Sequence, residues 1–308
     1  MSTDPWLLTA LTIITAATPL VYAAIGELVT EKSGVLNLGV EGMMLGGAVD
    51  SFAVAHISGS GYLGALGGAC AGMLLAALFA LLTLGLQASQ VASGLALTIF
   101  GVGLTALLGQ SLVGVAFAGV PDLPIPVLSE LPIVGLLLFR HDIFVYGSFI
   151  LVAAVSWFLY YTRAGLTLRA VGDSDSAAHA LGINVLRWRF FATVFGGACA
   201  GIAGSYLSLS YSPMWVENMT AGRGWIALAL VVFATWRPGR LMLGAYLFGS
   251  ISILQLHGQA YGLEIPSQIM SMLPYLATII VLVLISLDQG KIRRHAPQCI
   301  GKSFYPTN

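Results

Sequence analysis

Long apolar runs separated by short polar breaks dominate the chain. Because a helix needs roughly 20 apolar residues to cross the hydrocarbon layer of a membrane, these runs predict about nine membrane-spanning helices. The predicted spans are residues 6–25, 38–57, 61–86, 91–112, 142–161, 190–211, 225–236, 241–256 and 272–287. Ambiguous breaks near 27–42 and 121–139 leave about eight or ten spans as alternatives. The predicted fold is an all-α, polytopic integral membrane helix bundle, with residues 1–308 as a single domain.

The stretch between the fourth and fifth predicted spans, residues 121–140, departs from this pattern. It contains prolines at positions 121, 124, 126 and 132, and so cannot form one straight helix. Its apolar run 131–139 is too short to cross the membrane, and we expect this run to lie in the interface or to re-enter.

Basic residues gather in three polar segments. Residues 162–189, 237–240 and 288–308 hold four, two and four of the thirteen Lys and Arg residues. Short basic loops stay on the cytoplasmic side of a bilayer. The distribution therefore predicts an N-terminus outside, a cytoplasmic loop at 162–189 and a cytoplasmic tail at 288–308.

The middle of the cytoplasmic loop predicts a short helix that Asp173 or Ser174 caps and Gly182 ends. Its small-residue face consists of Ala177, Ala178 and Leu181. Such a face suits docking onto a partner. The alternative is a solvated connector, because basic cytoplasmic loops follow from topology without any partner.

Composition supports the membrane assignment. The chain is 57% hydrophobic and only 8% charged, with a mean hydropathy of +0.90, whereas about a quarter of the residues in a soluble domain are charged. A net charge of zero without a basic face argues against a nucleic-acid partner.

No catalytic or metal-binding constellation stands out in the sequence. The five histidines are scattered, and three cysteines cannot form a disulfide framework. Residues 296–303 match a relaxed phosphate-loop pattern, but no strand precedes them and no helix follows, so we assign no nucleotide site there. We therefore expect a chain that is not an enzyme and binds no cofactor itself.

An internal echo links two of the predicted spans. The sequence GGACAG occurs at residues 67–72 and again at 196–201, an offset of 129. Because the predicted spans run in opposite directions, the two copies indicate an inverted-topology repeat. The alternative is chance, in a chain rich in Gly and Ala. The spacing of small residues along these spans predicts closely packed helices in either case.

Residues 162–204 carry a more specific pattern. Its matching positions are Thr162, Gly165, Ala170, Gly172, Ala177, Ala178 and residues 182–185 (Gly-Ile-Asn-Val). This pattern resembles the cytoplasmic loop and following helix of permease subunits of bacterial ABC importers of the ribose and simple-sugar type. The segments 26–48 and 217–229 are similar to the nucleoside-transporting subgroup of that family.

The resemblance implies a multi-pass subunit of the bacterial cytoplasmic membrane. It implies as partners a second permease subunit (a homologous different chain), ABC ATPase subunits that bind ATP and Mg, an extracytoplasmic solute-binding protein and membrane lipid. ATPase coupling would then use Asp173, Ser176, Ala177, Ala178, Gly182, Ile183 and Asn184. Ser176 stands where the Glu-Ala-Ala-x-x-x-Gly motif of other ABC importers has Glu, so detailed contacts do not carry over.

Polar residues at or near membrane depth suggest where a solute would pass, because such residues are costly there. Asn37, Glu41 and Asp50 flank one glycine-rich hinge, and Asn218, Thr220 and Arg223 lie beside another. Phe100 and Trp225 would supply flat faces for a purine. In the alternative interpretation, Glu41 caps a helix or binds freed backbone, and Arg223 anchors at the interface or pairs with Glu217.

Two functional hypotheses follow. The first is the permease subunit of an ABC importer that passes a nucleoside or related simple sugar inward. The rival is a self-contained, ion-coupled secondary transporter or channel that uses Glu41 and Asp50. The cytoplasmic loop with its short helix distinguishes them, because a self-contained carrier does not need it.

Overall fold

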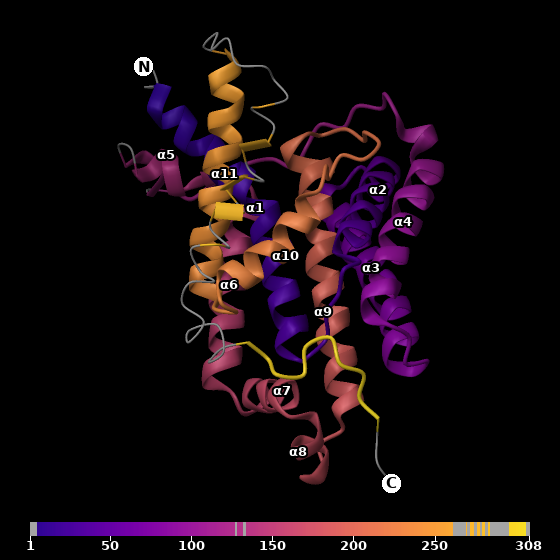
Figure 1. Ribbon diagram of the computed structural model, residues 1–308. Coiled ribbons are helices and arrows are strands. Elements are labelled where there is room, and N and C mark those ends of the chain that lie inside the picture. The colour runs from indigo at the N-terminus through magenta and orange to yellow at the C-terminus, as the bar shows by residue number, and fades with distance from the viewer. Residues whose placement is uncertain are drawn as a thin grey trace.

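The computed structural model describes residues 5–126, 128–131, 134–260 and 296–305, with scattered residues between 269 and 283. This part of the chain is mostly helical (Figure 1). The α-helices are α1 (Pro5–Lys32), α2 (Val40–Ser58), α3 (Gly61–Ala80), α4 (Gln90–Gly109), α5 (Val134–Leu138), α6 (Ile143–Tyr161), α7 (Arg163–Asp173), α8 (Asp175–Ala180), α9 (Val185–Tyr206), α10 (Arg223–Phe233) and α11 (Pro238–Ala260). Two π turns, Leu81–Gly85 and Leu207–Tyr211, prolong α3 and α9, and a 3-10 turn, Gln110–Leu112, ends α4.

Five helical segments of the described chain are long and apolar enough to cross a membrane. They are Trp6–Lys32, Gly61–Gly85, Gln90–Leu112, Ile143–Tyr161 and Val185–Tyr211. Each coincides with a predicted span, and α2 and α11 coincide with two more. The predicted span 272–287 falls largely outside the described residues. The chain is thus a helical integral membrane protein.

The predicted span 225–236 is wrong as a full crossing. Helix α10 has 11 residues, which makes it roughly 16 Å long, about half the thickness of the hydrocarbon layer. It begins after Gly222, at φ +82°, and ends before a turn in which Thr235 and Trp236 have φ of +49° and +52°. Left-handed backbone cannot continue a right-handed helix, so both ends of α10 are fixed by the turns that flank it.

The prediction that the proline-rich stretch 121–140 does not form one straight helix is confirmed. The stretch contains the two-residue strands β1 (Leu123–Pro124) and β2 (Arg140–His141), which pair antiparallel with Leu123 opposite His141. Between them lie a 3-10 turn, Leu128–Glu130, and α5. The apolar run 131–139 thus contributes a helix of only five residues.

Helix α1 lies at the centre of the bundle. Its residues from Ala16 to its end are buried, and it contacts α9, α11, α10 and α6. Helices α2, α3 and α9 pack against one another beside it, and α4 packs on the far side of α2 (Figure 1). Segments that are far apart in the sequence therefore form the core together.

The close packing predicted from the glycines is confirmed where α3 crosses α9. A Cβ atom added to Gly201 would collide with the carbonyl oxygen of Gly68, and one added to Gly72 would collide with that of Gly197. Only glycine lets two helix backbones touch in this way. The two GGACAG copies therefore lie face to face, and the helices run antiparallel, because Gly64 faces Leu209 while Gly72 faces Gly197.

Candidate functional site

Six α-helices of the described chain start with a side-chain cap, whereas α2 and α10 start without one. The capping oxygens belong to Ser60 (α3), Ser89 (α4), Asp142 (α6), Thr162 (α7), Ser174 (α8) and Asn184 (α9). The starts of α2 and α10 follow Gly39 and Gly222, which have no side chain to offer. Uncapped N–H groups inside a membrane protein need another acceptor.

Helix α2 begins inside the bundle rather than at its end. Leu38 lies against α4, where the Thr98 hydroxyl donates to its carbonyl oxygen at 3.0 Å. Gly39 packs against Leu97, and the amide oxygen of Asn37 accepts its N–H at 2.9 Å. Asn37 is fully buried and its own N–H donates to Glu27 Oε1 at 3.1 Å. Asn37 thus organises the backbone that leads into α2.

Glu41, in the first turn of α2, supplies the acceptor that α10 lacks. Its Oε1 accepts the Thr220 hydroxyl at 2.5 Å and the Gly222 N–H at 2.8 Å, and its Oε2 accepts the Gly224 N–H at 2.6 Å. The carboxyl group is buried. One side chain of α2 therefore holds the start of a helix about 180 residues further along the chain, and the starts of both helices meet inside the bundle.

The local sequence explains why the loop before α10 can reach Glu41. Asn218, Ala221 and Gly222 all have left-handed backbone, with φ of +57°, +47° and +82°, a conformation that Gly and Asn adopt most easily. At Gly224 an added Cβ would lie 2.6 Å from Glu41 Oε2. The Gly-Arg-Gly sequence is therefore required by the close approach of the carboxyl group.

Arg223 supports the same loop from within it. Its Nη1 donates to the carbonyl oxygens of Met219 at 3.1 Å and Thr220 at 3.3 Å, and its guanidinium lies 5.6 Å from the centre of the Tyr211 ring. The structure shows no ion pair between Arg223 and Glu217 in the described part of the chain. Arg223 is half-buried and lies in sequence between Gly222 and Gly224, whose N–H groups Glu41 accepts.

The other predicted pathway residues do not join this cluster. Asp50 lies further along α2, half-buried beside Gly67, without a hydrogen bond to any described residue. Asn218, Phe100 and Trp225 are exposed; Phe100 is on the surface of α4 and Trp225 on that of α10. The structure therefore brings together Asn37, Glu41, Thr220 and Arg223, and leaves the remaining four at the periphery.

Two acidic residues of α1, Glu27 and Glu31, also support the chain around the start of α2 and the end of α10. Neither was predicted as a site residue. Glu31 Oε2 accepts the indole N–H of Trp236 at 2.5 Å, which fixes the end of α10. Glu27 Oε1 accepts the N–H of Asn37 at 3.1 Å, and beside it Gln90 Oε1, at the start of α4, accepts the N–H of Leu36 at 2.8 Å. Buried polar groups in an otherwise apolar helix are costly without partners. That cost was the available signal for Glu27 and Glu31.

The second set of predicted residues lies at one end of the bundle, around α8. The hydroxyl of Ser174 caps α8, and Gly182 follows it with φ +81°, so the predicted short helix is present with these limits. Asp173, Ser176, Ala177, Gly182 and Asn184 are exposed, Ile183 is half-buried and Ala178 is buried. The face offered to a partner therefore consists of small and polar residues, with the large apolar side chain of Leu181 exposed beside them.

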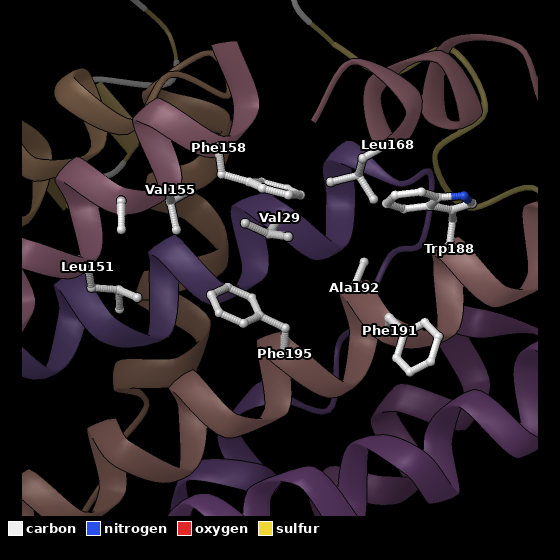
Figure 2. Close-up of a pocket in the computed structure, with 10 residues that line it drawn as sticks. Val29, Leu151, Val155, Phe158, Leu168, Trp188, Phe191, Ala192 and Phe195 are labelled. Carbon is white, nitrogen blue, oxygen red and sulfur yellow. The ribbon is translucent and has the colours of Figure 1, made fainter. Parts of the chain in front are cut away.

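An apolar groove of about 300 Å³ lies between α1, α6 and α9, and Figure 2 shows Phe158, Phe195 and Trp188 around it. Its lining residues are Val29, Leu151, Ala154, Val155, Phe158, Leu168, Trp188, Phe191, Ala192 and Phe195. Apart from the indole of Trp188, none of these side chains offers a hydrogen bond. A polar solute needs placed donors and acceptors, so we do not regard this groove as a solute site.

Three features together define a polytopic membrane transport protein. They are the apolar spanning helices, the two helix starts that meet inside the bundle and the short exposed helix at one end. The chain matches the family described as the permease component of branched-chain amino acid transport systems over residues 9–284. It belongs to that family, and it is a permease subunit of an ABC importer.

Relatives similar to this chain over nearly its full length carry related names. One is a provisionally named glucose ABC transporter permease of Haloferax volcanii, 42% identical, covering 94% of this chain and 95% of that protein. A nucleoside ABC transporter permease of Lactococcus lactis is 34% identical, with 87% and 89% covered. A guanosine ABC transporter permease of Bacillus subtilis is 31% identical, with 86% and 88% covered.

Proposed function

We propose that this subunit passes a nucleoside or a related simple sugar across the membrane. The route runs past the starts of α2 and α10, which Glu41 joins inside the bundle. The observation that supports this route is the position of the Glu41 carboxyl group. It accepts hydrogen bonds from the Thr220 hydroxyl and from the N–H groups of Gly222 and Gly224 inside the bundle. Non-helical backbone at membrane depth is tolerated where it is buried in protein or lines a pathway. Discontinuous helices of this kind form the solute sites of many transporters.

The choice of solute rests on the relatives named for guanosine, nucleosides and glucose. All three solute types present several hydroxyl or amide groups to their surroundings. Thr220, Asn37 and Arg223 carry matching hydrogen-bonding groups next to the starts of α2 and α10. These groups now bind Glu41, Gly39 and two loop carbonyls, and a passing solute would take over some of these bonds. A weak site suffices in this subunit if a binding protein delivers the solute, since tight binding would slow its release.

The energy source in this proposal is ATP hydrolysis in partner ATPase subunits that dock around α8. The exposed small-residue helix, held by Ser174 and Gly182, is the docking element. The further partners are a second permease subunit, of homologous but different sequence, and an extracytoplasmic binding protein. The exposed apolar faces of α3 and α4 would meet lipid or that second permease.

The topology in this proposal has about nine crossings or partial crossings, with the N-terminus outside and the C-terminus in the cytoplasm of a bacterial cell. We further propose that α3 and α9 are equivalent members of an inverted repeat. Each carries the GGACAG sequence and continues into a π turn, at Leu81–Gly85 and Leu207–Tyr211. The antiparallel contact of the two copies supports this relation.

Uptake by whole cells tests the proposed solute. Cells without their own nucleoside and sugar uptake would express this chain together with its partner permease, ATPase and binding protein, and receive a panel of labelled solutes. We expect accumulation of at least one nucleoside or simple sugar, and none when the ATPase carries a replaced phosphate-loop lysine. Accumulation of branched-chain amino acids, without any nucleoside or sugar, would contradict the proposal.

A further inference from the structure

Residues 296–305, called the strap here, cross the end of the bundle at which α7 and α8 lie (yellow in Figure 1). The N–H of Cys299 donates to the carbonyl oxygen of Gly172 at 2.9 Å, at the end of α7. The N–H of Gly301 donates to the carbonyl oxygen of Gly34 at 3.2 Å, just after α1. The strap is thus bound to two elements that are far from it in the sequence.

Arg189, near the start of α9, connects the strap to α8. Its guanidinium is fully buried and donates to three groups: Ser33 O at 3.2 Å, Lys302 O at 3.1 Å and Asp175 Oδ2 at 3.1 Å. A buried charge is costly unless it is paired with an opposite charge and hydrogen-bonded, and Arg189 has both kinds of partner. The end of α1, the strap and α8 therefore share one buried cation and hold fixed positions relative to one another.

Phe304 is the strap residue that reaches α8 itself. Its ring lies 5.4 Å from the ring of His179, centre to centre, and packs in a small buried cluster with Val171, Ala178 and Val185. Phe304 also forms one wall of a groove of about 290 Å³. The rest of the groove is lined by His179 and residues 182–186.

The surroundings of this groove point to a protein occupant. The groove lies mainly in the segment between the spanning helices α6 and α9, so lipid tails do not fill it. Two large apolar side chains adjacent in sequence to its walls are exposed: Leu181 at 81% and Tyr305 at 63%. Exposed apolar groups grouped around a groove on a polar surface mark an interaction site. One lining residue of the groove, His179, belongs to α8, and three others, Gly182, Ile183 and Asn184, are predicted coupling residues.

We propose that the strap is half of the surface to which the partner ATPase docks, and that the groove between Phe304 and residues 182–186 receives an apolar side chain of the ATPase. This inference rests on the proposed coupling through α8 and adds a second element to it. The strap keeps α8 in register through Arg189 and supplies Phe304 as a wall of the groove. The residues at 296–303 that imitate a phosphate loop are, in this account, part of a docking strap.

Binding of the purified ATPase to the purified permease pair in lipid nanodiscs tests the proposal. Phe304→Ala should weaken ATPase binding about tenfold, as truncation of an anchor at an interface does. Phe304→Leu, which keeps the apolar wall, should restore most of the affinity. Phe191→Ala serves as the matched control, because it removes the same ring from an exposed site on α9 within a membrane-spanning segment.

Leu181→Asp in the same assay separates this inference from the proposed function. If Leu181→Asp weakens ATPase binding and Phe304→Ala leaves it unchanged, coupling through α8 stands and the strap has no part in docking. If neither variant changes binding, coupling through α8 itself is wrong. A photo-crosslinking residue at position 305 should capture the ATPase, and one at Ile57, exposed at the end of α2, should not. Absence of the crosslink at 305 overturns the proposal.

Discussion

At the scale of single residues, Glu41 is the side chain that joins the start of α2 to the start of α10. Its carboxyl group has three donors, and all three lie in the Thr220 to Gly224 loop. The sequence identified Glu41, because an acid in an apolar run has to be satisfied. It did not identify the partner, because nothing local relates position 41 to position 222. The structure shows the hydrogen bonds that the capping alternative expects, and contact of Glu41 with a solute stays a prediction.

The contact of Glu41 with the Thr220 to Gly224 loop is called the junction here. Replacing Glu41 by Gln tests whether the junction serves transport. The amide of Gln would turn an NH₂ group toward one of the donors from which the carboxylate now accepts a hydrogen bond. The start of α10 would therefore lose one hydrogen bond. We expect solute uptake to fall about tenfold, the equivalent of roughly 1.4 kcal/mol for one such bond. Stimulation of the ATPase by loaded binding protein should persist, because α8 lies at the end of the bundle.

Asp50→Asn is the matched control for this experiment, since it removes a carboxylate from the same helix without breaking a hydrogen bond to any described residue. Uptake should stay near the wild-type level in that variant. Equal uptake in wild type and Glu41→Gln would mean that the junction is purely structural. A loss in Asp50→Asn alone would favour an ion-coupled route.

Arg189 shows the limit of sequence reasoning at the same scale. It lies in a basic stretch with Arg187, and charge counting treats the two alike. The structure exposes Arg187 and buries Arg189 completely. Helical periodicity separates the two side chains by about 200°, since each residue turns by roughly 100°. Deciding which of them faces inward requires the packing of the strap and α1, which is tertiary information.

Among the elements, α8 and α10 illustrate what a sequence can and cannot predict. The limits of α8 follow from local signals, a serine cap and a glycine stop, and the structure has both. The limits of α10 depend on Glu41 at one end and Glu31 at the other. The apolar run 225–236 was predicted as a span because local sequence gave no other limits. The real ends of α10 are set by partners in α1 and α2.

The contact between α3 and α9 gives a prediction about stability. Gly201→Leu would place a side chain where the Gly68 carbonyl lies, and the helices would have to separate. Overpacking of this kind costs about 1–3 kcal/mol, so we expect the unfolding temperature in detergent to fall by several degrees. Gly103→Leu is the control, because an added Cβ there meets nothing within 4 Å. Equal unfolding temperatures for the two variants would contradict the packing described.

The proposed coupling through α8 gives a second prediction about an element. Gly182 has φ +81° and open space around it, so Ala and Trp would both strain the backbone by roughly 1–2 kcal/mol. Only Trp would also add bulk to the docking surface. The ATPase rate stimulated by loaded binding protein should therefore fall about tenfold in Gly182→Trp relative to Gly182→Ala. The idea fails if the two variants are stimulated to the same extent.

At the scale of the whole molecule, hydropathy predicted most of the path of the chain. The five long spans were found because each is an uninterrupted apolar run of bilayer length. The way α1, α2, α3 and α9 share one core was not predictable, because it depends on glycine contacts between segments more than a hundred residues apart. The strap was missed for a similar reason: the phosphate-loop pattern in its sequence says nothing about packing, and its partners lie in or next to α1, α7, α8 and α9.

Membrane orientation is tested by labelling cysteines from either side. In a Cys70→Ala background, which leaves only the buried Cys199 and Cys299, a cysteine replacing the exposed Ser176 should react only from the cytoplasm. One replacing the exposed Glu217 should react only from outside. Labelling of both positions from the same side of intact cells or inverted vesicles is incompatible with the proposed topology.

The most direct test of the whole account is solute import by the purified transporter in proteoliposomes. The permease pair and ATPase would be reconstituted with loaded binding protein added outside, and the uptake of labelled guanosine and glucose followed with and without ATP inside. We predict that uptake of at least one of these solutes requires internal ATP and is unchanged when sodium and proton gradients are abolished. Uptake that proceeds without ATP and stops when an ion gradient is removed would contradict the account.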